Sequence, residues 1–273
     1  METTMLTASQ RHQFETEGYT TAPDFFDARE VAAMQAELER LHREGKLNNV
    51  ATDGDGTTPS KHAANLQICP MTPHSRLIRS LKYADKVVSA VSALVGDPVV
   101  FKLDQLFYKP AHHGAGTNWH QDNAYWHQSH PTKGVGMWTA VHAATVANGT
   151  MHIVPGSHKQ LEEHVRDPGS NHHIYAPKVR DEDALAIELP AGGVLFFNFG
   201  ILHSTRANRT SSGRAGLALH FMNADYANAK FFENDNTARI TGPAATGGMA
   251  EYGELVAGTW DAEVERMLVQ PVR

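Results

Sequence analysis

The run VVFKLDQLFY (residues 99–108) is the first of a series of short apolar runs, rich in β-branched and aromatic residues, that follow Pro98. The later runs are bounded by turn residues and lie at 135–147, 150–154, 185–189, 193–199 and 215–223. Short runs of this composition predict β-strands. Many such strands after a helical segment are typical of a double-sheet jelly roll with helices packed outside. We therefore expect a mainly β fold with flanking α-helices.

Turn signals separate these runs. Asn148-Gly149 stands between two of them, and this dipeptide is the strongest short signal for a β-hairpin. Pro190, with Gly192 and Gly193, marks a second turn. The sequence therefore predicts a hairpin at the first position and a turn at the second.

The part of the chain before Pro98 has helical patterns instead. Two pairs with capping-box spacing, Thr7 with Gln10 and Asp27 with Glu30, predict the starts of two helices. A further helix is expected from about residue 85. The second helix should bury one apolar stripe, formed by Val31, Met34, Leu38 and Leu41.

Length and composition favour one large domain. The chain has 273 residues, of which 41% are hydrophobic and 20% charged, and β sandwiches and barrels often fill about 250 residues as a single domain. We expect a helical flank at about 1–97, a jelly-roll core at about 98–225 and a C-terminal extension at 226–273. The polar, glycine-rich segment 48–62 is expected to be a mobile loop.

The charge balance and the absence of long apolar stretches exclude several classes of function. The formal net charge is −6 and the charges are scattered, which argues against nucleic-acid binding. No stretch approaches the ~18 apolar residues of a membrane span, and the first residues lack the apolar core of a signal peptide. A cytoplasmic protein without membrane contact is therefore expected. The sequence leaves the oligomeric state open.

The cysteine and histidine counts indicate which metal chemistry is available. Cys69 is the only cysteine, so the chain can form neither an internal disulfide nor a thiolate metal cage, and we expect this side chain to be buried or half-buried. Seventeen histidines instead favour a metal site built from imidazole and carboxylate ligands.

Two imidazoles and one carboxylate are the ligand set of non-haem Fe(II) oxygenases, and this set leaves coordination positions open. Its trace in a sequence is a His-x-Asp/Glu triplet, which occurs at 42–44 and at 120–122. The first triplet lies on an expected helix, where residues i and i+2 do not face each other, whereas on a strand they share a face. We therefore select His120 and Asp122, with His203 after the run VLFFNFG as the distant ligand.

Arg214 follows His203 by eleven residues and opens another apolar run, where its guanidinium could hold the far carboxylate of a dicarboxylate ligand. With these residues in order along the chain, the sequence resembles the phytanoyl-CoA dioxygenase family of Fe(II)- and 2-oxoglutarate-dependent oxygenases. The resemblance covers most of the chain and rests on LFYKP (106–110), WHQD (119–122), MWTAV (137–141), NGTMHIVPGSHK (148–159), His203 and Arg214.

The resemblance implies a double-stranded β-helix, the cupin-like form of the jelly roll, and a dioxygenase that uses Fe(II), 2-oxoglutarate and O2. It makes His120, Asp122 and His203 the catalytic metal ligands, and Arg214 the anchor of the C5 carboxylate of 2-oxoglutarate. Other positions that match co-substrate contacts of the family are Thr205, Trp138, Gln105 and Gln67.

The implied reaction releases succinate and CO2 and hydroxylates the substrate, or desaturates, cyclises or epoxidises it. Related halogenases carry a small residue where Asp122 stands, so halogenation is not expected. Two alternatives are considered. One is a metal-dependent hydrolase or isomerase that uses the same ligands and in which an open position activates water. The other is a non-enzymatic binder of small molecules on the same scaffold, in which the metal site has decayed. The hydrolase has no need of Arg214, and the presence of all three ligands argues against the binder.

Substrate recognition is expected in two segments, 123–130 just after the metal carboxylate and 164–180, a long polar and aromatic loop. These segments predict a small polar or aromatic metabolite rather than a bare fatty chain. The side chains selected as substrate contacts are Tyr125, Trp126, His127, His172, His173 and Tyr175.

Overall fold

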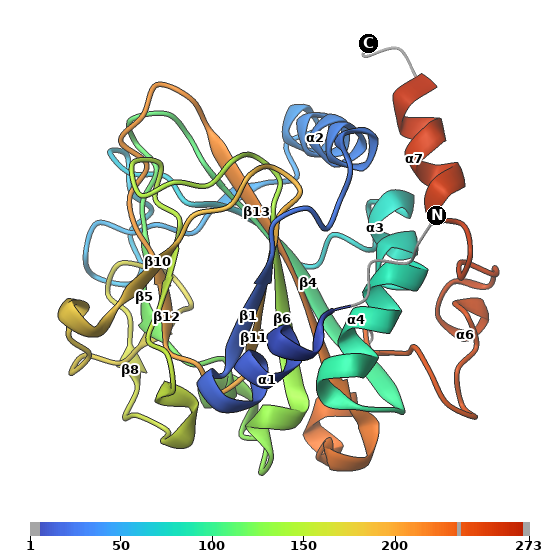
Figure 1. The fold of residues 1–273 in the computed structure, drawn as a ribbon. Helices are drawn as coiled ribbons and strands as arrows, with labels where there is room; N and C mark the ends of the chain where they lie inside the picture. The colour runs from blue at the N-terminus through green and yellow to red at the C-terminus, as the bar shows by residue number, and fades with distance from the viewer. Residues whose placement is uncertain (1–5, 234–235, 270–273) are drawn as a thin grey trace.

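Two antiparallel sheets form the centre of the computed structural model, which describes residues 6–233 and 236–269 (Figure 1). The larger sheet has the spatial order β1 (Tyr19–Ala22), β11 (Val194–Asn198), β6 (Gly134–Ala140), β13 (Arg214–Asn223), β4 (Val99–Lys109), β3 (Leu66–Ile68) and β2 (Asn48–Asn49), and β14 (Ala238–Arg239) also pairs with β4. The smaller sheet has the order β10 (Leu185–Ile187), β7 (Met151–Ile153), β12 (His203–Thr205) and β5 (Thr117–His120). The expected mainly β fold with flanking helices is confirmed.

The period-2 pattern of the strands explains how the larger sheet separates two cores. On β13, Leu217 and Leu219 belong to a cluster shared with the helices, whereas Ala218 belongs to a cluster shared with the smaller sheet. On β11, Phe196 faces the helices and Phe197 faces the smaller sheet. Because successive side chains point to opposite faces, continuous apolar runs are what a sheet buried on both sides requires.

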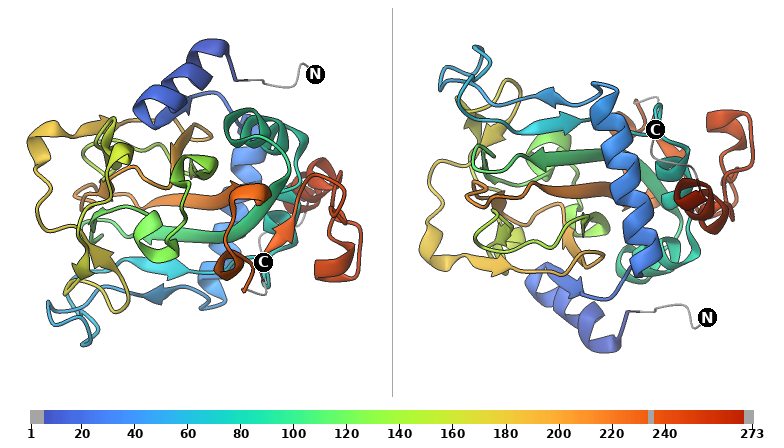
Figure 2. Two further views of the ribbon diagram at one scale, coloured as in Figure 1. Left: turned by 90° about the horizontal axis from the view of Figure 1, so that it is seen from below. Right: turned by 90° about the horizontal axis from the view of Figure 1, so that it is seen from above.

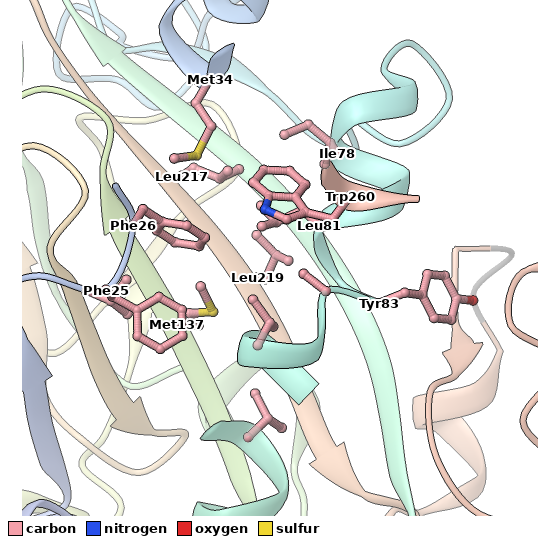
Figure 3. Close-up of a cluster of buried hydrophobic side chains, with 14 of the residues drawn as sticks. Phe25, Phe26, Met34, Ile78, Leu81, Tyr83, Met137, Leu217, Leu219 and Trp260 are labelled. Atoms are coloured by element: carbon pink, nitrogen blue, oxygen red, sulfur yellow. The ribbon is translucent and has the colours of Figure 1, made fainter. Parts of the chain in front are cut away.

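Helices cover the outer face of the larger sheet. Figure 2 shows α2 crossing the strands on that face, and Figure 3 shows Met34 of α2 and Trp260 of α7 beside Leu217 and Leu219 of β13. Burying each such side chain stabilises the fold by about 1.5–3 kcal/mol. The helices are α1 (Ala8–Glu17), α2 (Ala28–Arg43), α3 (Arg76–Leu81), α4 (Asp85–Val95), α5 (Asn123–Trp126), α6 (Met249–Tyr252) and α7 (Trp260–Val269). Short 3-10 helices occur at Pro131–Lys133, Ser157–Lys159, Asp181–Asp183, Ala224–Tyr226 and Ala229–Phe232.

The predicted helix starts are confirmed, but the N-terminal part is less purely helical than expected. Thr7 and Asp27 are the N-caps of α1 and α2, each in a complete capping box. However, β1, β2 and β3 also come from the first 97 residues and pair with the larger sheet. These strands have only two to four residues, so their pairing depends on neighbouring strands rather than on a local pattern. β2 also occupies the start of the expected loop 48–62.

The predicted hairpin at Asn148-Gly149 is wrong. β6 ends at Ala140 and β7 belongs to the other sheet, so the two runs do not pair. The Asn148 side chain instead accepts a hydrogen bond from the Thr145 backbone N–H at 2.8 Å, and Gly149 has φ 79°. The dipeptide therefore ends a turn in a connection between sheets. The second predicted turn is confirmed, because the Gly193 N–H donates to the Pro190 carbonyl at 3.0 Å.

The segment 164–180 is not a continuous loop. β8 (Val165–Arg166) and β9 (Ile174–Tyr175) pair antiparallel within it, and Ser170 bridges back to Ala51. None of the helices in the described ranges is both long and apolar enough to span a membrane.

Candidate functional site

β5 and β12 are neighbours in the smaller sheet, and their register places His203 directly opposite His120. Asp122 follows β5 by two residues and stands at the N-cap of α5. Its Oδ1 lies 3.9 Å from His120 Nε2 and 3.7 Å from His203 Nε2. One ligand atom of each residue lies within 4.8 Å of the others. The three predicted metal ligands therefore converge on one point.

The convergence of His120 and Asp122 comes from a turn and not from strand alternation, because β5 ends at His120. The side chain of Gln121 holds this turn. Its amide donates to the Gln160 carbonyl and its oxygen accepts from the Glu162 N–H, both at 2.8 Å. Because the Gln121 side chain is bound to the loop at residues 160–162, the side chains of His120 and Asp122 on either side of it both point towards the cluster.

Both histidines present the same ring nitrogen to the cluster. His120 Nδ1 lies 2.9 Å from the Asn118 carbonyl, and His203 Nδ1 lies 3.0 Å from the Ile201 carbonyl. A carbonyl oxygen only accepts, so each Nδ1 carries the proton and each Nε2 is left with a lone pair. Backbone partners of this kind fix the tautomer and the ring orientation of metal-binding histidines.

The electrostatics of the cluster suit a divalent cation. Burial lowers the pKa of His120 to about 3, with a further contribution from His203, and burial also lowers the pKa of His203. Burial by itself would raise the pKa of Asp122, but His203, His220 and His120 together bring it below its usual value. At neutral pH the cluster is therefore two neutral imidazoles and one carboxylate, which are the protonation states that metal binding needs.

His220 is a fourth member of the cluster that the sequence analysis did not select. It is buried on β13, and its Nε2 lies 3.2 Å from Asp122 Oδ2. Asp122 Oδ1 is the atom nearest the other two histidines, so His220 is placed to hold the carboxylate from its second oxygen. The sequence contains a signal for this position: His220 lies six residues after Arg214, and the period of two in a strand puts both side chains on the same face of β13.

We predict that His220→Phe weakens metal binding without removing a ligand. The phenyl ring fills the space but removes the imidazole nitrogen that lies 3.2 Å from Asp122 Oδ2, and changes to residues that support a metal ligand typically cost 10–100-fold in metal affinity. Titration with Co(II), followed by its d–d absorption, measures the loss. The matched control is His152→Phe, on β7 beside β12, which should leave affinity unchanged. Equal affinity of the two variants would contradict the role.

A second group of side chains forms a cationic end of the cavity. Arg214 and Lys109 are opposite each other on β13 and β4, and each is 1% exposed. Lys109 Nζ donates to Thr205 Oγ1 at 2.7 Å, and the indole of Trp138 lies 5.7 Å from the Arg214 guanidinium. Within the described residues, neither cation has a carboxylate within ion-pair distance.

Burial of two unpaired cations is costly, and their pKa values reflect it. Burial lowers the pKa of Arg214 to about 10. Burial, followed by the charges of Arg214 and Arg206, lowers the pKa of Lys109 well below its ordinary value. In the part of the chain that the structure describes, Arg214 Nε has no hydrogen-bond partner, although another nitrogen of the guanidinium donates to the Gly149 carbonyl. An anion bound here would restore the missing interactions.

The metal cluster and the cationic end belong to one cavity of about 220 Å³. Every residue predicted to bind metal or co-substrate lines it, and Gln67 Nε2 donates to Gln105 Oε1 at 3.0 Å. Lys109 is a further lining residue to which the sequence analysis gave no role, because that role depends on the pairing of β4 with β13. Cys69 also lines the cavity but is exposed, so the expectation that it is buried or half-buried is wrong.

The residues predicted to contact substrate divide into two groups. Tyr125, Trp126, His172 and His173 line the cavity, whereas His127 and Tyr175 do not. His127 is the exposed residue that ends α5 in the left-handed conformation, and Tyr175 is half-buried on β9. Within these short segments, neighbouring side chains point in different directions, and the sequence alone does not say which ones face inward.

Comparison with known proteins places this geometry in context. A sequence model described as phytanoyl-CoA dioxygenase (PhyH) matches residues 14–216. The chain is 26% identical over 241 residues to ectoine dioxygenase of Halomonas elongata, covering 81% of this chain and 71% of that protein. It is 28% identical over 232 residues to L-proline trans-4-hydroxylase of Streptomyces griseoviridis, covering 75% of this chain and 82% of that protein.

A solved structure with the same fold is that of the non-haem α-ketoglutarate-dependent carbocyclase SnoK from nogalamycin biosynthesis. It superposes with a TM-score of 0.68 at 21% identity, covering 80% of this chain and 85% of that one. The expected double-stranded β-helix is therefore confirmed.

Proposed function

The chain belongs to the phytanoyl-CoA dioxygenase family, and on this premise we propose that it is an Fe(II)- and 2-oxoglutarate-dependent oxygenase that hydroxylates a small polar or aromatic metabolite. The observation that supports this most is the presence of two complementary sites in one cavity. One is a His-Asp-His cluster with free Nε2 atoms, and the other is a buried pair of cations that has no carboxylate partner among the described residues.

Each residue has a defined part in this proposal. His120, Asp122 and His203 hold the metal, and Arg214, assisted by Lys109, binds the C5 carboxylate of 2-oxoglutarate. Bound iron would supply oxygen activation coupled to conversion of 2-oxoglutarate to succinate and CO2. The chain itself supplies position and a dry environment, which are the usual contributions of a protein to cofactor chemistry.

Around the co-substrate, Thr205 fixes the Lys109 ammonium, and Trp138 forms an apolar wall beside Arg214. Gln105 and Gln67 present a neutral amide pair on the strands next to them. We assign these residues to co-substrate binding, and we treat residues 1–273 as one catalytic domain.

A water-activating hydrolase or isomerase on the same scaffold is the second candidate. It would use the three ligands and an open position, but it gives no reason to bury Arg214 and Lys109 at the cost of their solvation. A dicarboxylate co-substrate gives that reason. A binder without catalysis would have no use for three converging ligand atoms.

We predict that protein loaded with Fe(II) produces succinate from 2-oxoglutarate in air even without a primary substrate, at a slow uncoupled rate. Zn(II) should occupy the same cluster and produce none, because zinc has no redox chemistry. Succinate is measured by mass spectrometry against a boiled-protein blank. Equal rates with Fe(II) and Zn(II), or no succinate with fully loaded Fe(II) protein, would refute the proposed function.

We also predict hydroxylation or another oxygen-dependent change, and no halogenation. With iron bound, Asp122 would take the coordination position that a halide needs, so chloride could bind only by displacing a ligand. The Asp122→Gly variant should be almost inactive, because the residues around the vacated ligand position are not arranged to hold a halide. The assay is mass spectrometry of products formed in chloride and chloride-free buffer. A chlorinated product from the unmodified protein would overturn this prediction.

A further inference from the structure

The cavity wall that is left free beside the metal cluster carries no ionic side chain. It is formed by Leu103 and Phe107 of β4, Tyr125 and Trp126 of α5, and His172 and His173 before β9, and we call these six residues the uncharged wall. Among the described residues that line the cavity, Asp, Glu, Lys and Arg occur only as Asp122, Lys109 and Arg214. In the proposed function all three are already engaged by metal and co-substrate.

The uncharged wall is preformed, because its segments are connected to one another. The Ile174 N–H donates to the Tyr125 hydroxyl at 3.0 Å, which joins α5 to β9. The ring of His173 lies 5.8 Å from Phe107 and 4.2 Å from His172. The Tyr125 ring lies 6.1 Å from that of His120. A ligand against this wall therefore lies beside the metal cluster.

The two histidines of the wall act as neutral groups. Burial, together with His172 and His120, lowers the pKa of His173 to about 3. Burial and the charge of Arg166 lower the pKa of His172. At neutral pH both rings can donate and accept hydrogen bonds without carrying charge.

These features select against two kinds of substrate. A charged group placed against the wall would lose its hydration and find no counter-charge, which is strongly unfavourable. A bare hydrocarbon chain would desolvate the imidazoles without replacing their hydrogen bonds. Flat aromatic faces also favour a ring that can stack or pack edge-on.

We propose that the part of the substrate that enters this cavity is an uncharged ring system that carries carbonyl or hydroxyl groups. The inference rests on the proposed function, because it assumes that Arg214 and Lys109 are occupied by 2-oxoglutarate. A zwitterionic amino acid, an anionic thioester or an organic cation would not meet a matching group on the wall.

The test compares three ring compounds of similar size that differ in charge: coumarin, coumarin-3-carboxylate and N-methylquinolinium. Binding to the Zn(II)- and 2-oxoglutarate-loaded protein is measured by ligand-observed NMR titration, so that no turnover interferes. We expect coumarin to bind at least about tenfold more tightly than either charged ring. The proposal is overturned if coumarin does not bind, or if either charged compound binds as tightly.

A charge placed on the wall should invert this order. In Leu103→Lys we expect coumarin-3-carboxylate to bind at least as tightly as coumarin. Leu161→Lys, at an exposed site outside the cavity, is the matched control and should keep the original order. Thermal melting checks that the variants fold. If Leu103→Lys does not fold, Phe107→Lys takes its place as the wall variant. No inversion in a folded wall variant would contradict the assignment of the wall.

Two measurements separate this inference from the proposed function. Without 2-oxoglutarate, coumarin-3-carboxylate should bind at Arg214 and be displaced when 2-oxoglutarate is added. If succinate forms but the charged rings bind best to the loaded protein, only the substrate class is wrong. If coumarin binds best but Fe(II) protein never forms succinate, the neutral cavity stands and the proposed function fails.

Discussion

His203→Ala protein should fail to retain Fe(II) and should form no succinate. The reason is geometric, because removal of the His203 imidazole leaves only two of the three converging ligand atoms, those of His120 and Asp122. Changes to residues that merely support metal ligands cost 10–100-fold in affinity. Loss of a ligand should therefore cost more than about 100-fold. The same result is expected for His120→Ala.

The measurement is iron content after gel filtration, together with succinate formation under saturating 2-oxoglutarate. The control is His152→Ala, which removes a histidine from the strand beside β12 but from outside the cluster. Circular dichroism establishes that each variant is folded. A His203→Ala protein that keeps one Fe(II) per chain and full activity would remove the basis of the metal assignment.

The sequence predicts the parts of the fold that depend on local chemistry. The capping boxes at Thr7 and Asp27 contain their own partners within three residues, so each helix start is determined locally. The long apolar runs of β4 and β13 likewise identify buried strands without reference to the rest of the chain. A mainly β fold that follows N-terminal helices can therefore be predicted from local sequence alone.

The failures share another physical origin, which is competition from distant parts of the chain. Asn148-Gly149 has the residues typical of a hairpin turn, but β7 pairs with β10 and β12 in the smaller sheet. The turn therefore lies in a connection that passes from one sheet to the other. Similarly, β1 has four residues and no distinctive pattern. It forms a strand because it pairs with the free edge of β11. Pairing choices of this kind are decided by the assembled sheet.

The candidate site shows the same division. His120 and Asp122 could be selected because they are close in the sequence, and His203 and Arg214 because each is next to a recognisable strand. Lys109 could not be selected this way, because its partner Thr205 is 96 residues away. Residues that act through long-range contacts need the structure, and residues that follow strand periodicity, such as His220, do not.

The largest effect on co-substrate binding is expected for Arg214→Leu. In the proposed function, this change removes the guanidinium fork that would hold the C5 carboxylate and leaves that buried anion opposite Lys109 alone. Truncating one partner of a buried, hydrogen-bonded charge pair costs about 2–5 kcal/mol. The 2-oxoglutarate concentration for half-maximal succinate formation should therefore rise at least roughly 30-fold. Fe(II) binding, which the proposal assigns to other residues, should stay within about twofold.

Comparison with three other variants separates shape from charge. Arg214→Lys should recover only part of the affinity, because an ammonium cannot form the two parallel hydrogen bonds of a guanidinium. Lys109→Met should weaken 2-oxoglutarate binding less than Arg214→Leu, since Lys109 is already held by Thr205. Arg209→Leu removes an exposed arginine and should change nothing. Unchanged 2-oxoglutarate dependence in Arg214→Leu would assign the cationic end of the cavity to the primary substrate, because two buried cations beside a metal cluster still require an anion.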